Sequence, residues 1–360
     1  MKLASRRCRT VCFLSLLLPA GWSVAAPSDE TWSDWNTAVI DQHVIPRYQT
    51  LGEAAATMAK SVASYCATPS ADGLGEAQAG FVSAMQAWQG IQHVKFGPVL
   101  YLMRDSAMQF WPDRKNVGQR QLYAALTSDG AAYDDTFFRD ASISIKGYPA
   151  LERLLFDDEI DAKRVKYPRY CDLMTGIAGN IANMTGSIAA QWDEARSQYT
   201  EAGHNDFFEE SADASVQMLK SLVEPLEVLL DTKLRRVLGE SAADARWKKS
   251  ESWRSGRSID NLKTNIDTLA ALYEGTTPIS VKTLLQGEEQ AELAERISQS
   301  FATLSQQLSV FPEPADDSLS ETQWQALQAL AAGIRTLDEQ LDEAMIALGI
   351  NLGFNSRDGD

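Results

Sequence analysis

Apolar residues recur every three or four positions along most of this chain, which is the spacing of one face of an α-helix. The clearest stripe lies near the C-terminus and consists of Leu327, Leu330, Ile334, Leu337, Leu341, Met345 and Leu348. Ser320 and Gln323 precede it with the spacing of a capping box. Comparable stripes begin at Leu173, Met218, Ile259 and Leu293. We see no convincing strand alternation, so the pattern predicts an all-α protein of packed helical bundles.

The helical pattern breaks in three places. In the longest break, 96–148, Gly, Pro, Asp and aromatic residues replace the apolar stripe. Shorter breaks lie at 203–206 and at 251–258. The break near 203 predicts two helical halves, an N-terminal half, 27–200, that contains the irregular segment, and a C-terminal half, 205–355. Because helices satisfy most of their backbone polar groups internally, we expect function where the pattern breaks.

The N-terminus has the pattern of an export signal. Its positive residues are Lys2, Arg6, Arg7 and Arg9. An apolar run, 11–20, and a small-residue stretch, 23–26, follow. This order predicts that 1–25 form a cleaved signal peptide, and that the mature protein is soluble in the periplasm or cell envelope. An uncleaved anchor is the alternative, although the apolar run is shorter than the roughly 20 residues that a membrane span needs.

The charge balance is strongly acidic. The full chain carries a formal charge of −16, and loss of the four positive residues of the leader takes it to −20. Such a balance argues against nucleic acid or an anionic membrane surface as the main partner. It leaves room for cationic ligands or metal ions, and most of it is expected on solvated helix surfaces.

Two cysteines lie outside the leader, Cys66 and Cys171. In an exported protein, such a pair usually forms a disulfide, and we predict one here. Two free, buried thiols are the alternative.

Among polar residues, Glu152 is the most informative. It lies in the segment 147–156, where Gly147 permits a sharp entry and Pro149 suits the start of a helix. Glu152 borders the inward face of this helix, so its carboxylate must be paired or bind something. It is either a ligand for a cation or polar substrate, or half of a salt bridge with Arg254 or Arg257. Those two arginines suit carboxylates and anionic ligands equally.

Motifs of several enzyme classes are absent from the sequence. It has no zinc-protease helix, no Gly-rich phosphate loop and no Ser in a nucleophile-elbow setting. Its histidines are His43, His93 and His204, and none has a metal-ligand neighbour three or four positions on. The aromatic residues around Trp111 are either a pocket wall or part of the core.

Taken in order, several segments resemble the imelysin family of exported bacterial proteins. The segments are Pro46, Tyr48, Leu51, Cys66, 96–98, 110–114, 147–152, Cys171, 254–258, 348–349 and 353–360. The resemblance covers nearly the whole mature chain, and the tail makes the ordered set fairly specific. It implies an all-α architecture of two bundle-like halves, with a functional site where they meet. It also implies a location in the cell envelope and a link to iron uptake, and some members are described as metallopeptidases.

One position departs from the family signature, which is Gly, any residue, His, two of any residue, then Glu. Gly147 and Glu152 match, but Pro149 stands where the His is expected. Imidazole is a favoured ligand of transition metals, and a proline side chain coordinates none. Glu152 alone could still serve an all-oxygen site for a hard cation. Iron or another divalent cation is therefore the candidate cofactor, with Glu152 as its candidate ligand.

The leading hypothesis is a non-enzymatic, imelysin-like envelope protein that assists iron uptake or binds an iron-related ligand where the halves meet. A component of iron uptake in the outer membrane or periplasm is its candidate partner. The candidate ligand-binding residues are Glu152, Gly147, Pro149, Trp111, Asp113, Arg114, Arg254 and Arg257. A divergent metallopeptidase and a structural or partner-docking protein are the alternatives.

Overall fold

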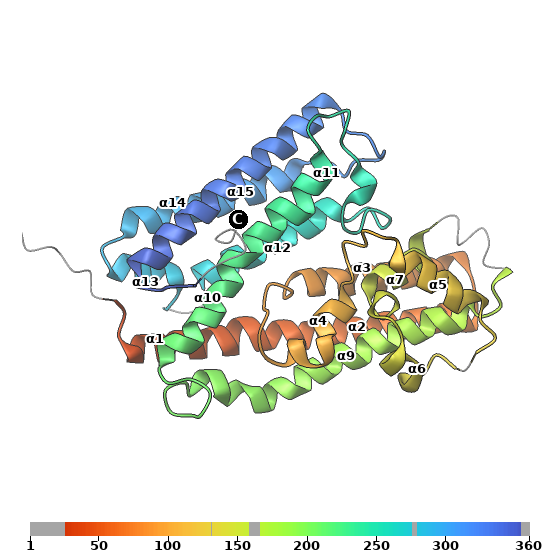
Figure 1. The fold of residues 1–360 in the computed structure, drawn as a ribbon, viewed down its shortest axis with the longest axis horizontal. Coiled ribbons are helices and arrows are strands. Elements are labelled where there is room, and N and C mark those ends of the chain that lie inside the picture. The colour runs from red at the N-terminus through yellow and green to blue at the C-terminus, as the bar shows by residue number, and fades with distance from the viewer. Residues whose placement is uncertain (1–25, 131, 158–165, 276–278, 354–360) are drawn as a thin grey trace, which may run out of the picture.

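The computed structural model describes residues 26–130, 132–157, 166–275 and 279–353. The predicted signal peptide, 1–25, and the end of the tail, 354–360, lie outside these residues. Every regular element of the described chain is a helix, which confirms the predicted all-α fold class. The helices form two bundles that lie one above the other in Figure 1. No helix in the described ranges is long and apolar enough to cross a membrane.

The first bundle is built around one long helical rod. This rod is continuous through α1 (Asp29–Val39), the π-helix η1 (Ile40–Val44) and α2 (Ile45–Ala67). The helices α3 (Ala71–Gln89) and α9 (Tyr170–Thr200) pack against α2, and α7 (Tyr148–Phe156) lies against α3 and α9. Apolar residues of these helices, including Trp88, Leu151 and Trp192, are almost completely buried, so the apolar stripes do form the core.

The second bundle begins with another continuous rod. It comprises α10 (Ser211–Glu227), the π-helix η5 (Val228–Arg235) and α11 (Arg236–Leu238). A 3₁₀ turn, η6 (Trp247–Lys249), precedes α12 (Ser258–Glu274), α13 (Val281–Gly287), α14 (Ala291–Val310) and α15 (Glu321–Ala347). Helix α14 packs against α12 and α15, and α10 packs against α15. The capping box predicted at Ser320 and Gln323 is present at the start of α15.

The two bundles meet through helices from both. Helix α1 packs against α10, and α3 packs against α12. Asn36 fixes the first of these contacts from a fully buried position. Its amide donates to the Ser211 carbonyl at 2.8 Å, and its side-chain oxygen accepts from the Ser215 hydroxyl at 2.7 Å. The second contact brings the end of α3 against the middle of α12, beside a cavity that lies between the bundles.

The segment 96–148 contains more helix than its broken pattern predicts. It holds η2 (Gly97–Met103), α4 (Arg104–Met108), α5 (Val117–Thr127), α6 (Asp135–Asp140) and η3 (Ile143–Ile145). Apart from α5, each of these helices is only one or two turns long. An apolar stripe needs several turns to become visible in a sequence, so these elements left no periodic signal.

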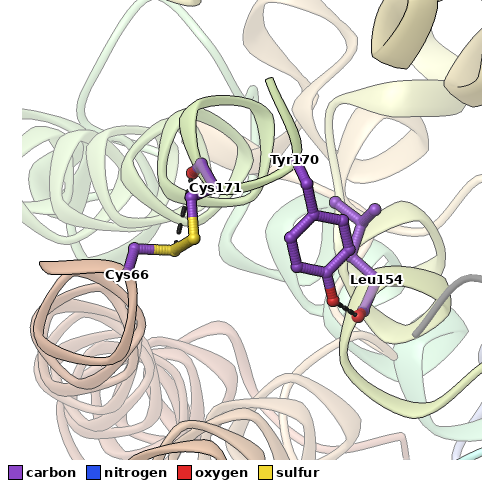
Figure 2. Close-up of a disulfide and its surroundings, with 4 residues drawn as sticks. All are labelled: Cys66, Leu154, Tyr170 and Cys171. Carbon is purple, nitrogen blue, oxygen red and sulfur yellow. Dashed lines mark hydrogen bonds between the residues drawn. A yellow bond between two sulfur atoms is a disulfide. The ribbon is translucent and has the colours of Figure 1, made fainter. Parts of the chain in front are cut away.

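The predicted disulfide is confirmed between Cys66 and Cys171, whose Cα atoms are 5.4 Å apart. Figure 2 shows it joining the end of α2 to the start of α9. Beside it, the Tyr170 hydroxyl donates to the Leu154 carbonyl oxygen near the end of α7. The start of α9 is thereby tied both to the central rod and to the helix that carries Glu152.

Close packing explains two glycines of the broken segment. A side chain at Gly147 would place its Cβ 2.2 Å from the carbonyl oxygens of Ala107 and Met108. Gly97 has a φ of +69°, and a Cβ there would lie 2.9 Å from the Trp192 ring. Both positions require glycine, because atoms of other segments of this protein lie too close to allow any side chain. Gly147 therefore acts by bringing α4 against the start of α7.

Candidate functional site

A cavity of about 590 Å³ lies between the two bundles. Its wall comes from the end of α3, the η2 loop, α10, η5 and α12. Apolar wall residues include Phe96, Leu229 and Leu269. This cavity is called the large cavity below. Its size is that of pockets that bind small organic molecules, which are mostly apolar with a few fixed polar groups.

A buried network of charged and amide groups forms one wall of the large cavity. Lys233 and Glu251 make an ion pair at 2.7 Å, and both side chains are more than 90% buried. The Lys233 ammonium also donates to Gln89 at 2.9 Å and to Asn265 at 2.7 Å. Glu251 accepts from the Gln109 amide at 2.7 Å. Buried charges persist only where such partners compensate for lost hydration, so these residues are held in one arrangement.

Two π-helices aim polar residues at this junction, and a proline accompanies each. Pro225 lies inside α10, where it lacks the N–H that would bond to Ser221, and η5 follows with Lys233. Pro46 is the second residue of α2, which follows η1, and η1 carries His43. A π-turn shifts the side chains that follow it around the helix axis, and such turns are frequent at functional sites.

His43 and His93 form a buried pair beside the large cavity. Their Nε2 atoms are 2.8 Å apart, and each residue is only 6% exposed. Burial, reinforced by the positive charges of Arg47 and Lys95, lowers the pKa of His93 to about 3. Burial and the neighbouring His93 lower the pKa of His43 well below its ordinary value. Both rings are therefore neutral at physiological pH, with one proton shared along the Nε2–Nε2 hydrogen bond.

Two residues that line the large cavity each carry one side-chain atom that has no hydrogen-bond partner in the described structure. The atoms are Nδ1 of His93 and Oε1 of Gln109, and both atoms are buried. A buried polar group without a hydrogen bond costs about 1–3 kcal/mol.

The mouth of the large cavity carries an exposed apolar loop. Leu100 and Tyr101 line the cavity, and the next two residues, Leu102 and Met103, are 87% and 58% exposed. Leu102 and Met103 also have left-handed backbone, with φ of +57° and +56°. Such backbone is strained for residues other than glycine and is concentrated at functional sites.

A smaller cavity of about 210 Å³ surrounds Glu152, and it is called the small cavity below. Glu152 is 5% exposed. Its Oε1 accepts two hydrogen bonds from Ser255, from the backbone N–H at 3.0 Å and from the hydroxyl at 2.7 Å. Burial raises the pKa of Glu152, while these bonds and the charges of Arg254 and Arg153 act against the rise.

The predicted salt bridge from Glu152 to Arg254 or Arg257 is wrong. Arg254 pairs with Asp157 at 3.2 Å, and Arg257 pairs with Asp260 at 2.7 Å. The segment before α12 is a run of turns rather than helix, and each of the two guanidinium groups pairs with a different aspartate. This turn instead points the N–H and hydroxyl of Ser255 at the carboxylate.

The structure brings some of the other predicted site residues together and separates others. Trp111 lines both cavities and so stands between them. Asp113 and Pro149 line the small cavity, but both carboxylate oxygens of Asp113 accept backbone N–H groups at the start of α5, at 2.7 and 2.8 Å. Arg114 is exposed, and Arg114 and Arg257 line neither cavity.

The residues around Glu152 do not fit a transition-metal ion. Pro149 supplies no donor atom, and one Glu152 oxygen already accepts two hydrogen bonds. Among the described residues, no three His, Cys, Asp or Glu side chains are grouped closely enough to hold a metal. The basic side chains that line the small cavity would also repel a cation.

The comparisons with known proteins agree with this architecture. A family model described as imelysin, of peptidase family M75, matches residues 44–344. The chain belongs to the imelysin family. Iron-regulated protein A of Synechococcus elongatus is 24% identical over 320 residues, covering 84% of this chain and 83% of that protein. The crystal structure of an imelysin-like protein from Psychrobacter arcticum superposes with a TM-score of 0.77 at 18% identity, covering 92% and 99% of the two chains.

Within this imelysin, sequence reasoning missed the residues that line the large cavity. One signal was available for Lys233, because it falls on the apolar stripe of Leu226, Leu230 and Val237. A lysine at a core position needs a buried partner. The partner Glu251 and the pairing of His43 with His93 had no local signal, since only the tertiary fold brings these residues together.

Proposed function

We propose that this imelysin binds an organic, iron-related ligand in the large cavity between its halves, outside the cytoplasm and without catalysing a reaction. The observation that carries the proposal is the large cavity itself, with apolar walls and the fixed Lys233–Glu251 network. A ligand that wraps iron in its own donor atoms needs shape and a few polar anchors from the protein, and it needs no protein ligands on the metal.

Two further observations support this proposal. The relative in Synechococcus is named for its regulation by iron. The leader at 1–25 has the pattern of an export signal, which would place the protein where iron carriers arrive. A component of iron uptake in the outer membrane or periplasm is the partner we propose for delivery.

Isothermal titration calorimetry tests the proposal with ferrous ion, ferric ion and ferric complexes of a hydroxamate, a catecholate and citrate. We expect at least one chelate to bind one-to-one, and the free ions not to bind. Val228→Trp should abolish chelate binding, because Val228 lines the large cavity and is 49% exposed, so a larger ring fills space there. Val310→Trp is the matched control, since Val310 is 71% exposed and lines neither cavity.

Two outcomes would contradict the proposal. The first is the absence of binding for every chelate, or binding that Val228→Trp leaves unchanged. The second is stoichiometric binding of free iron that disappears in Glu152→Ala, which would favour direct coordination by this carboxylate.

A further inference from the structure

The small cavity concentrates positive charge in an acidic protein. Its basic lining residues are Arg153, Arg236, Lys248, Lys249 and Arg254. Its acidic lining residues are Asp113 and Glu152. The chain as a whole has a formal charge of −16, so a concave site with more bases than acids is contrary to the average of its surface. Low-dielectric walls focus the field of such a cluster on the cavity.

The carboxylates near the small cavity are already engaged, whereas two of the arginines are not. Asp113 caps α5 with both oxygens, and Oε1 of Glu152 is held by Ser255. Asp157 neutralises Arg254. Among the described residues, Arg153 and Arg236 make no direct ion pair with a carboxylate, although Asp113 lies near enough to both for its charge to act against the lowering of their pKa values by burial. Nε of Arg236 is buried without a hydrogen-bond partner in the described chain.

An aromatic side chain holds two of the cations beside this cavity. The guanidinium carbon of Arg254 lies 4.2 Å from the centre of the Trp253 ring, and the Lys248 ammonium lies 5.3 Å from it. Cation–π contacts of this kind position like charges near one another without neutralising them. Burial and repulsion from Arg254 lower the pKa of Arg153. Burial and Arg114 lower the pKa of Arg236.

We infer that the small cavity is a binding site for a small multivalent oxyanion, with Arg153 and Arg236, which both line it, as its principal anchors. Guanidinium groups recognise carboxylate and phosphate oxygens through paired N–H donors. The volume of about 210 Å³ suits a phosphate or a short polycarboxylate. Trp111 separates this site from the large cavity, so the inference does not depend on the proposed function.

Calorimetric titration of the mature protein with inorganic phosphate and with citrate, at about 20 mM NaCl to limit screening, tests this inference. We expect one-to-one binding of at least one probe, and the probe that binds distinguishes a phosphate site from a polycarboxylate site. Arg236→Gln should weaken binding by about tenfold or more, the loss of one charge-assisted contact. Arg235→Gln removes the same charge from the adjacent, half-exposed residue and should leave affinity unchanged.

The inference is overturned if neither probe binds, or if Arg235→Gln weakens binding as much as Arg236→Gln. Arg153→Gln provides a second variant, since Arg153 also lines the small cavity and makes no direct ion pair in the described chain. Circular dichroism confirms that each variant is folded. Val228→Trp should retain anion binding while losing chelate binding, so failure of either proposal can be recognised separately.

Discussion

Acid should destabilise this protein through the buried pair of His43 and His93. The perturbation is a fall in pH from about 8 to about 5, which protonates histidine in the unfolded chain near pH 6.5. In the folded chain, the pKa of His93 is about 3, and that of His43 is also lowered, so the native pair stays neutral over this range. The unfolded state then binds more protons than the native state, and stability is lost as the pH falls below about 6.5.

The magnitude follows from the pKa difference of His93. A pH of about 5 is roughly 1.5 units below the pKa of histidine in the unfolded chain, and each unit is worth about 1.4 kcal/mol. His93 alone should therefore lower the free energy of unfolding by about 2 kcal/mol. His43 adds a loss of the same sign. Protonation of the accepting Nε2 would bring two N–H groups together across 2.8 Å, and burial opposes a charge on either ring, so the folded pair does not recover this loss by accepting a proton.

Urea unfolding at a series of pH values measures this effect. We expect the free energy of unfolding to fall below about pH 6.5 in the wild type, and to fall less steeply in His93→Gln. If the substitution also lowers the free energy of unfolding equally at every pH, the slope of that free energy against pH can still be measured. His204→Gln is the control, because His204 is exposed and should not alter the slope. Equal slopes in the wild type and His93→Gln would refute the neutral buried pair.

Three other predictions follow from single positions. Glu152→Gln should lose the pH dependence that Glu152 contributes. The raised pKa of Glu152 means that the native state keeps this proton to a higher pH than the unfolded state does. In the wild type this group therefore lowers the free energy of unfolding as the pH rises through and above about 4.5, and urea unfolding should show that the variant lacks this contribution. Gly147→Ala should destabilise the protein by about 3 kcal/mol or more, because the new Cβ would meet backbone atoms. Gly179→Ala, at a position of α9 with open space around it, should be neutral or stabilising by up to about 1 kcal/mol. Equal unfolding midpoints for the two variants would contradict this prediction. Replacing both Cys66 and Cys171 with Ala should cost about 2–5 kcal/mol, since the disulfide closes a long loop, and an unchanged melting temperature would show that the bond adds no stability.

The sequence alone determined the fold class and several local features of this imelysin. Helical stripes, the cap at Ser320 and the start of α7 depend on residues within a few positions of one another, so they are visible along the chain. The pairing of Cys66 with Cys171 followed from their being the two cysteines outside the leader. The missing His at position 149 was equally visible, because the family signature is contiguous.

Only the tertiary structure decided which side chains form the sites. The partners of each contact come from distant segments: His43 meets His93, and Glu152 meets Ser255 rather than the expected arginines. Burial then sets the chemistry, because removal of water raises the pKa of an acid and lowers that of a base, and neighbouring charges and hydrogen bonds add to or oppose that shift. Neither the positive small cavity of an acidic chain nor the buried pair of Lys233 with Glu251 follows from composition, since both depend on where folding places charges that are far apart in sequence.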